Sequence, residues 1–148
     1  MSDYTEAMTW INLSQRDHDI AFHLEETFTP LPVETICFHS QQAVEKALKA
    51  VLAYYEVNIE YTHNIRTLAE LCKVHTDVIF IDDKVVDRIT AFAVITRYIE
   101  DRHDYTEDTS KFALNQANLA LEAVKQFLKE SRAEADEKNQ QKKNYPNN

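Results

Sequence analysis

Apolar side chains recur along this chain every three or four residues, which is the spacing of one face of an α-helix. The pattern is strongest in its second occurrence, over residues 33–55. The apolar positions that share a face there are Val33, Ile36, Cys37, Val44, Ala47, Leu48, Val51, Leu52 and Tyr55. Glu45 and Lys49 add a charge pair four residues apart, in the order that stabilises a helix. We therefore predict a long amphipathic helix.

The polar side chains of this helix allow two interpretations. Helical periodicity favours a solvated polar face made of Ser40, Gln41, Gln42, Glu45 and Lys46. Against this, Gln41 falls on nearly the same line as Leu48 and Tyr55. A glutamine on that line would enter a layer between helices.

Two helices are predicted around this one. The first is capped by Ser2 or Asp3 and extends to about Glu26. Its recurring positions are Trp10, Leu13, Asp17, Ile20, Ala21 and Leu24. Prolines at 30 and 32 then interrupt the chain. After the second helix, Thr62 can cap a short third helix, with a face made of Ile65, Leu68, Leu71 and Cys72.

Two more helices complete the pattern. Asp82 and Asp83 mark the start of the fourth, whose face is Val85, Ile89, Phe92, Ile95, Thr96 and Ile99. Thr106 opens the last helix, with a stripe of Phe112, Leu119, Ala120, Ala123, Val124, Phe127 and Leu128. From Glu130 onward the apolar face ends, so we expect a frayed, disordered tail.

These elements predict an all-α fold. Four long helices and one short helix joined by brief connections form an up-and-down antiparallel bundle. We expect this domain to span residues 1–129 and the polar tail to span residues 130–148.

Composition supports this fold and excludes several classes of protein. The chain has 148 residues, enough for one core, and contains no glycine. Without glycine, positive φ angles are unfavourable and tight β-hairpins are hard to build. The glycine-rich phosphate loops of P-loop enzymes and Rossmann dehydrogenases are excluded outright.

Targeting signals and cysteine spacing indicate a cytoplasmic protein. No secretory signal is evident at the N-terminus, and the longest apolar stretch, around residues 89–95, is far too short to span a membrane. Cys37 and Cys72 lack the spacing of a redox or metal motif. We expect both to be reduced thiols buried in the core.

The net charge of −9 argues against a general nucleic-acid coat protein. Residues 1–128 carry 11 basic and 21 acidic side chains. A nucleic-acid phosphate would be repelled by such a body unless basic groups gather in one local cleft.

Metal chemistry is not favoured. A di-iron bundle needs two Glu-x-x-His pairs, and the spacing occurs at Glu60 with His63 and at Glu100 with His103. The first pair falls in a turn and the second at a helix end, not in the middle of a bundle. We therefore predict no metal site and no cofactor.

The most chemically dense segment is RYIEDRHDY, residues 97–105, which directly follows the apolar stretch ITAFAVI. Its acidic side chains could simply neutralise its two arginines at a solvated helix end. Alternatively, a helix that ends near Arg102 would free His103 to approach Arg97, because residues six apart on a straight helix diverge by about 120°. The residues themselves leave both interpretations open.

Two further blocks of sequence show a family resemblance. CFHSQQAVEKALKAVL at residues 37–52 and YTHNIRTLAEL at residues 61–71 resemble the HEPN family of small bacterial and archaeal helical proteins. Trp10, Asp17 and Ala21 also fit that family's first helix, so the resemblance covers roughly residues 8–128. It implies an up-and-down bundle that pairs as a two-fold homodimer.

The resemblance also implies an activity. Many HEPN proteins are metal-independent endoribonucleases with an arginine followed, after four to six residues, by a histidine, a pattern that Arg97 and His103 match. The histidine would transfer the proton of a ribose 2′-hydroxyl or of the leaving 5′-oxygen, and the arginine would hold the phosphate. DNA would not be a substrate. Further candidate contacts are Tyr98 and Arg102, with Asp17, Gln41, Gln42 and Lys46 as supporting polar residues.

Tyr105 completes a His-x-Tyr ending like that of the family's toxin branch. In that branch a partner nucleotidyltransferase can modify the tyrosine with adenylate. The branch usually has four residues between arginine and histidine, whereas this chain has five. The resemblance therefore predicts a toxin with a nucleotidyltransferase partner, or alternatively a non-catalytic nucleotide-binding or partner module.

Overall fold

The computed structural model describes residues 3–59, 62–95 and 105–145, apart from the side chains of residues 93–95. These residues form five α-helices and no β-strand. The helices are α1 (Tyr4–Thr27), α2 (Val33–Tyr54), α3 (Ile65–His75), α4 (Asp83–Ile95) and α5 (Glu107–Asn144). The predicted all-helical fold of four long helices and one short helix is confirmed.

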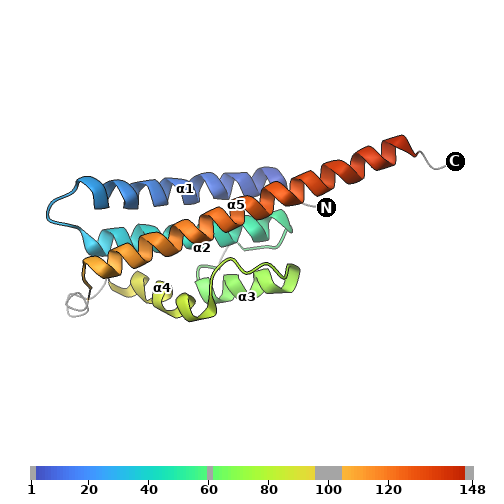
Figure 1. Cartoon of the computed structure of the whole chain (residues 1–148). Coiled ribbons are helices and arrows are strands. Elements are labelled where there is room, and N and C mark those ends of the chain that lie inside the picture. The colour runs from blue at the N-terminus through green and yellow to red at the C-terminus, as the bar shows by residue number, and fades with distance from the viewer. Residues whose placement is uncertain (1–2, 60–61, 96–104, 146–148) are drawn as a thin grey trace.

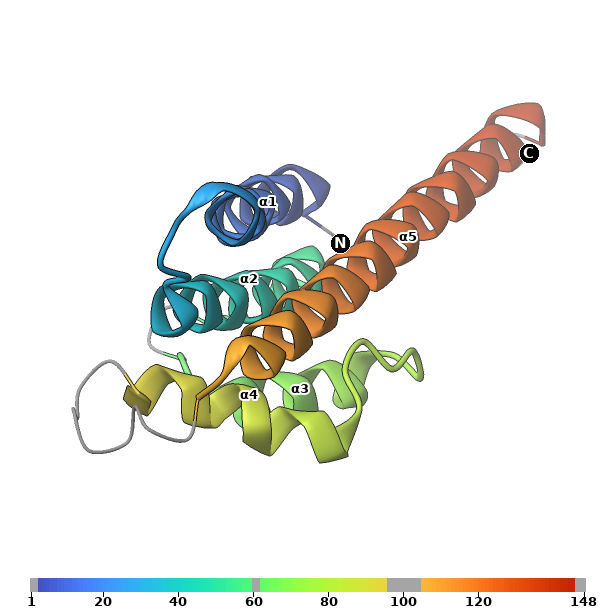
Figure 2. The ribbon, with the colours of Figure 1, turned by 60° about the vertical axis from the view of Figure 1, so that its left-hand side comes forward.

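Helix α2 is the centre of the bundle. It packs against each of the other four helices, whereas α1 also packs against α5 and α3 against α4. Figures 1 and 2 show α1 on one side of α2 and the shorter α3 and α4 on the other, with α5 crossing alongside. The long helices α1, α2, α4 and α5 alternate in direction along the chain, which is the predicted up-and-down order.

The core follows from this central position of α2. Nearly all of its predicted apolar stripe is buried, and alanines at 43, 50 and 53 are buried as well. Cys37 and Cys72 are free thiols inside the core, as predicted. Burial raises the pKa of each thiol to about 12. Both cysteines are therefore structural side chains.

The predicted burial of two apolar residues is wrong. Ile20 of α1 and Leu119 of α5 are both exposed. The two helices instead bury lines of smaller residues, because short side chains allow close helix packing. These buried residues are Ala7, Ile11, Ser14, Asp17 and Ala21 on α1, and Ala113, Ala117, Ala120 and Leu121 among those on α5.

Helix starts agree with the predicted caps at all but one position. The Asp3 carboxylate accepts a hydrogen bond from the Glu6 backbone N–H at 2.9 Å. The predicted cap of α3, Thr62, is wrong, because Asn64 takes this role and accepts from the Thr67 N–H at 3.1 Å. Asparagine is a strong N-cap, and the helix starts where its side chain can bond to the first turn.

The C-terminus of α2 requires a left-handed residue in a chain that has no glycine. Glu56 has a φ of 57°. Its N–H donates to the Ala53 carbonyl, and the Val57 N–H donates to the Leu52 carbonyl, each at 3.0 Å. This pair of bonds is a Schellman motif, in which glycine is the usual left-handed residue. A glutamate therefore holds a strained backbone position there.

The predicted disorder after Glu130 is wrong for residues 130–144, which continue α5 as helix. Loss of an apolar face removes packing, but Ala, Glu, Lys, Gln and Arg remain strong helix formers. Arg132 still contacts the bundle, over the Tyr4 ring at 4.6 Å. From Asp136 to Tyr145 every residue is exposed, and Figure 1 shows this end of α5 extending beyond the other helices.

Within the described residues, none of the helices combines the length and the apolar character needed to cross a bilayer.

Candidate functional site

The predicted catalytic pair, Arg97 and His103, lies outside the described residues, as do Tyr98 and Arg102. The residues on either side of that segment are described. The rings of Phe92 and Tyr105 meet edge to face, with centroids 6.0 Å apart. Tyr105 is partly buried against the core. The chain thus leaves the described structure and re-enters it at the same place on the bundle.

A first polar cluster joins α1 to α2 through a carboxylate. Asp17 of α1 is buried, and its Oδ1 lies 2.9 Å from Nδ1 of His39. Its Oδ2 accepts a hydrogen bond from Nζ of Lys46 at 2.5 Å. One carboxylate therefore binds two side chains of the neighbouring helix, which places the supporting residues Asp17 and Lys46 together. The histidine in this cluster has no sequence signal, because its partner lies 22 residues away on another helix.

The same helix pair contains buried neutral hydrogen bonds. The Ser14 hydroxyl donates to the Ala43 carbonyl at 2.6 Å. Gln41 is buried, and its Oε1 accepts from Nε2 of Gln42 at 2.9 Å. The interpretation that places Gln41 in a layer between helices is therefore confirmed. Gln42 itself is only partly buried.

A second cluster surrounds the Glu45–Lys49 pair. The Lys49 ammonium lies 2.8 Å from Oε1 of Glu45, and both residues are buried. Nδ1 of His63, from the connection before α3, is 3.0 Å from the same carboxylate oxygen. Lys49 Nζ also lies over the Trp10 ring, 5.1 Å from its centroid. The expectation of a solvated face is therefore wrong for Glu45, and Ser40 and Gln41 of that face are buried as well.

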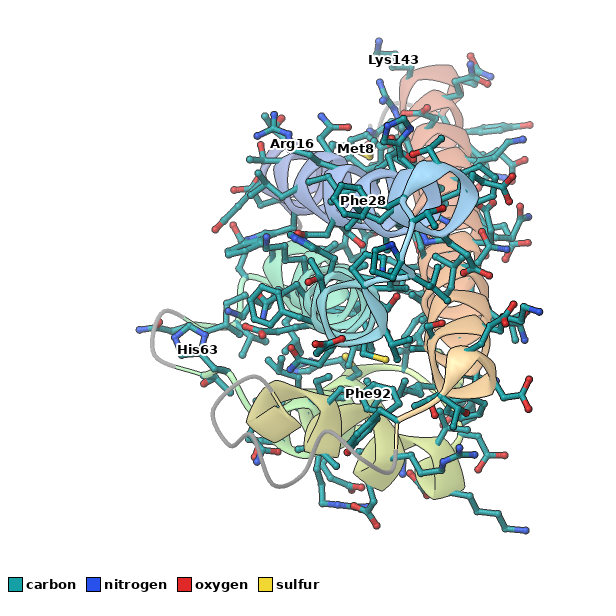
Figure 3. All side chains as sticks on the ribbon, turned by 90° about the vertical axis from the view of Figure 1, so that its left-hand side faces the viewer. Met8, Arg16, Phe28, His63, Phe92 and Lys143 are labelled. Carbon is teal, nitrogen blue, oxygen red and sulfur yellow. The ribbon has the colours of Figure 1, made fainter. Side chains whose placement is uncertain are left out.

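These clusters lie along one face of α2, at the spacing of His39, Gln42, Lys46 and Lys49. Figure 3 shows His63 at the outer side of this face, where its Nδ1 faces the Glu45–Lys49 pair. Each carboxylate is neutralised by a lysine, so the clusters attach α1 and the His63 connection to α2. Among residues 3–59, 62–95 and 105–145, no group of three or more His, Cys, Asp or Glu side chains could hold a metal ion.

A groove of about 320 Å³ separates α1 from the first turns of α5. Its lining residues are His18, Phe22, Glu25, Lys111, Leu114, Asn115 and Asn118. Burial lowers the pKa of His18 and raises the pKa of Glu25, because the charged form of each side chain loses hydration in the groove. Sequence periodicity had no signal for this groove, because its two walls come from opposite ends of the chain.

The helical architecture agrees with what comparison with known proteins finds. The family model for the HEPN domain matches residues 7–129. The crystal structure of an archaeal HEPN homologue is similar at a TM-score of 0.60 and 23% sequence identity, over 82% of this chain and 97% of that chain. At this identity the likeness shows the fold alone. Among curated proteins there is no significant match. Because the family model covers most of the chain, this protein belongs to the HEPN family.

Proposed function

We propose that this protein is a metal-independent endoribonuclease, with Arg97 and His103 as its catalytic pair. The supporting observation is the combination of HEPN membership with an arginine and a histidine in the family's spacing. Both residues belong to the segment whose flanking rings, Phe92 and Tyr105, meet on the bundle.

The chemistry needs only these two side chains and the RNA itself. His103 transfers a proton at the ribose 2′-hydroxyl or at the leaving 5′-oxygen. Arg97 binds the scissile phosphate and stabilises the negative charge that develops on its oxygens. The 2′-oxygen attacks phosphorus while the bond to the 5′-oxygen breaks. The products are a 2′,3′-cyclic phosphate and a 5′-hydroxyl, which excludes DNA as a substrate.

The proposed active unit is a homodimer. A two-fold axis beside the Phe92–Tyr105 contact would gather two arginines and two histidines into one cleft. Such a cleft would be locally positive on a chain of net charge −9, and it would overcome the general repulsion of RNA. A monomer at micromolar concentration in sedimentation equilibrium would contradict this composite site.

The proposed cellular role is that of a cytoplasmic toxin whose partner is a nucleotidyltransferase. Tyr105 is the candidate target for modification by that partner. Its ring contacts Phe92, so a bulky anionic group there would disturb the attachment of the catalytic segment. A gene that lies far from any nucleotidyltransferase gene would argue against this partner.

The decisive experiment is RNA cleavage in EDTA by purified wild-type protein and three variants. His103→Ala should abolish cleavage, and Arg97→Ala should slow it by about 100- to 1,000-fold, because it removes charge stabilisation in the transition state. Arg102→Ala is the matched control, an arginine of the same segment outside the pair, and should weaken RNA binding at most. Cleavage by His103→Ala at the wild-type rate, or cleavage only with added metal, would overturn the proposal in favour of a non-catalytic nucleotide-binding or partner module.

A further inference from the structure

Positive charge in the described part of the bundle is neutralised by carboxylates. The basic side chains that form ion pairs with Asp or Glu are Lys46, Lys49, Arg66, Lys73, Lys111 and Lys125. Arg88 and Arg132 lie over the rings of Phe112 and Tyr4. These groups have little free charge to offer an anionic partner.

The far end of α5 is different. Lys138, Lys142 and Lys143 are exposed and form no ion pair within the described residues. Residues 138–148 contain these three lysines and no acidic residue. Since the whole chain carries −9 and this end carries +3, residues 1–137 carry −12. Positive charge is therefore separated onto one end of one helix.

Other basic residues without an ion pair do not form such a group. Arg16, Lys84 and Lys129 lie on three different helices. Each has an acidic residue directly beside it in the sequence, at positions 17, 83 and 130. Lys138 also follows an acidic residue, Glu137, but Lys142 and Lys143 have none within four residues. The end of α5 is therefore the part of the described structure where lysines without an ion pair gather.

The spacing of these residues places charge and an aromatic ring together. Lys138 and Lys142 are one turn apart on α5, and Tyr145 directly follows the helix as its C-cap. Tyr145 is 80% exposed, which is unusual for a ring that serves packing. Figure 3 shows Lys143 near the end of α5, and Figure 1 shows this end extending beyond the other helices. Nothing in the described structure covers this surface.

We propose that residues 138–145 are a contact surface for single-stranded RNA, in which the three lysines bind phosphates and Tyr145 stacks on a base. Lysines beside an exposed aromatic ring are the combination that single-stranded nucleic acid requires, whereas an acidic peptide would need the charge alone. The proposal rests on the proposed ribonuclease function. It explains how an acidic protein captures an anionic substrate: the projecting helix end binds RNA outside the repulsion of the body.

The test measures binding separately from cleavage. The probe is a fluorescent single-stranded oligonucleotide with 2′-O-methyl riboses, which no 2′-hydroxyl attack can cleave. Its affinity for the full-length protein is measured by fluorescence anisotropy as a function of salt. Three phosphate contacts contribute about −2 to the slope of log affinity against log salt for a single strand. Neutralising Lys138, Lys142 and Lys143 together to glutamine should therefore reduce the slope by about 2.

The expected loss of affinity follows from this slope. Raising salt from about 50 to about 200 mM should weaken wild-type binding roughly 15-fold more than it weakens the triple variant. The matched control neutralises Lys73, Lys111 and Lys125, which changes net charge equally at lysines that are already paired. The control should keep nearly the full slope. Tyr145→Ser should weaken binding at least about fivefold with the slope unchanged, because stacking is not ionic.

Each of the following results would contradict the proposed RNA contact. An equal loss of RNA affinity in the triple variant and in its control would show a general effect of net charge. Unchanged binding in the triple variant, with reduced helix content by circular dichroism, would show that the lysines only stabilise the helix C-terminus. Equal binding of a polyglutamate peptide, insensitive to Tyr145→Ser, would show a surface for acidic proteins. Failure of the ribonuclease function is distinct, since wild type would then bind the probe but leave ordinary RNA uncut.

Discussion

Removing the Lys49 ammonium should destabilise the protein far more than an ordinary helix ion pair would suggest. In the variant Lys49→Met, the Glu45 carboxylate loses a partner at 2.8 Å in a site where the two side chains are only 7% and 5% exposed. Methionine has a similar volume and can pack its thioether against the Trp10 ring, so the change removes the positive charge with little loss of packing. Breaking one partner of a buried pair costs about 3–5 kcal/mol, because an unpaired charge stays buried.

We expect the lower end of that range, about 3 kcal/mol, because Nδ1 of His63 remains 3.0 Å from the carboxylate. This loss is a large fraction of the roughly 5–15 kcal/mol that separates a folded domain from its unfolded state. Replacing both partners, as Glu45→Leu with Lys49→Met, should recover most of the loss. An apolar pair leaves no charge in the site and is often neutral in stability.

The chain contains its own control for this experiment. Glu107 and Lys111 have the same residues, the same spacing and the same order, with a similar distance of 3.0 Å, but their side chains are 65% and 57% exposed. Lys111→Met should leave the free energy of unfolding nearly unchanged, because water solvates the remaining glutamate. Burial is the main difference between the two pairs.

The assay is urea denaturation followed by circular dichroism, with the free energy of unfolding taken by linear extrapolation at constant slope. The reasoning is refuted if Lys49→Met and Lys111→Met lose equal stability, or if the double variant at 45 and 49 loses the sum of its single changes. Either result would mean that burial does not determine the strength of the Glu45–Lys49 interaction.

Two further predictions concern the backbone and the pH dependence of stability. Glu56→Gly should raise the free energy of unfolding by about 0.5–1 kcal/mol, because glycine adopts a φ of 57° without strain. A lower thermal midpoint in this variant would show that the contacts of the glutamate outweigh the strain. Burial holds the pKa of His18 in the folded protein below 6.5. As the pH drops below 6.5, the unfolded chain therefore binds more protons than the folded protein does. The free energy of unfolding should decline over this range, down to the lowered folded-state pKa. His18→Gln should flatten that decline in urea titrations from about pH 7.5 to about pH 5, and an unchanged slope would contradict the burial of this ring.

Helix positions were predictable because their signals are local. The apolar spacing of α2, the breaks at Pro30 and Pro32 and the N-cap at Asp3 depend on residues within a turn or two of each other. The burial of Gln41 was also readable, since it lies on the apolar line. The last turns of α5 were not predicted because disorder was inferred from missing packing, although helix propensity alone continues the element to Asn144.

The candidate site was predictable only in part. The spacing of Arg97 and His103 and the motif blocks indicated the HEPN family, and the family is shown. Their pairing as a catalytic site stays a prediction, because both residues lie outside the described structure. The partnership of Asp17 with His39 and Lys46 was not readable, because each bond crosses between helices and leaves no periodic signal.

The amino-acid sequence by itself determined which residues share a helical face and where most of the helices begin. Only the tertiary structure decided what covers each face. Glu45–Lys49 and Glu107–Lys111 are the same motif in sequence, yet α1 and the His63 connection bury the first while water surrounds the second. Periodicity is a property of one helix, whereas burial depends on the neighbour that packs against it. That neighbour comes from a distant part of the chain, so local spacing carries no information about it.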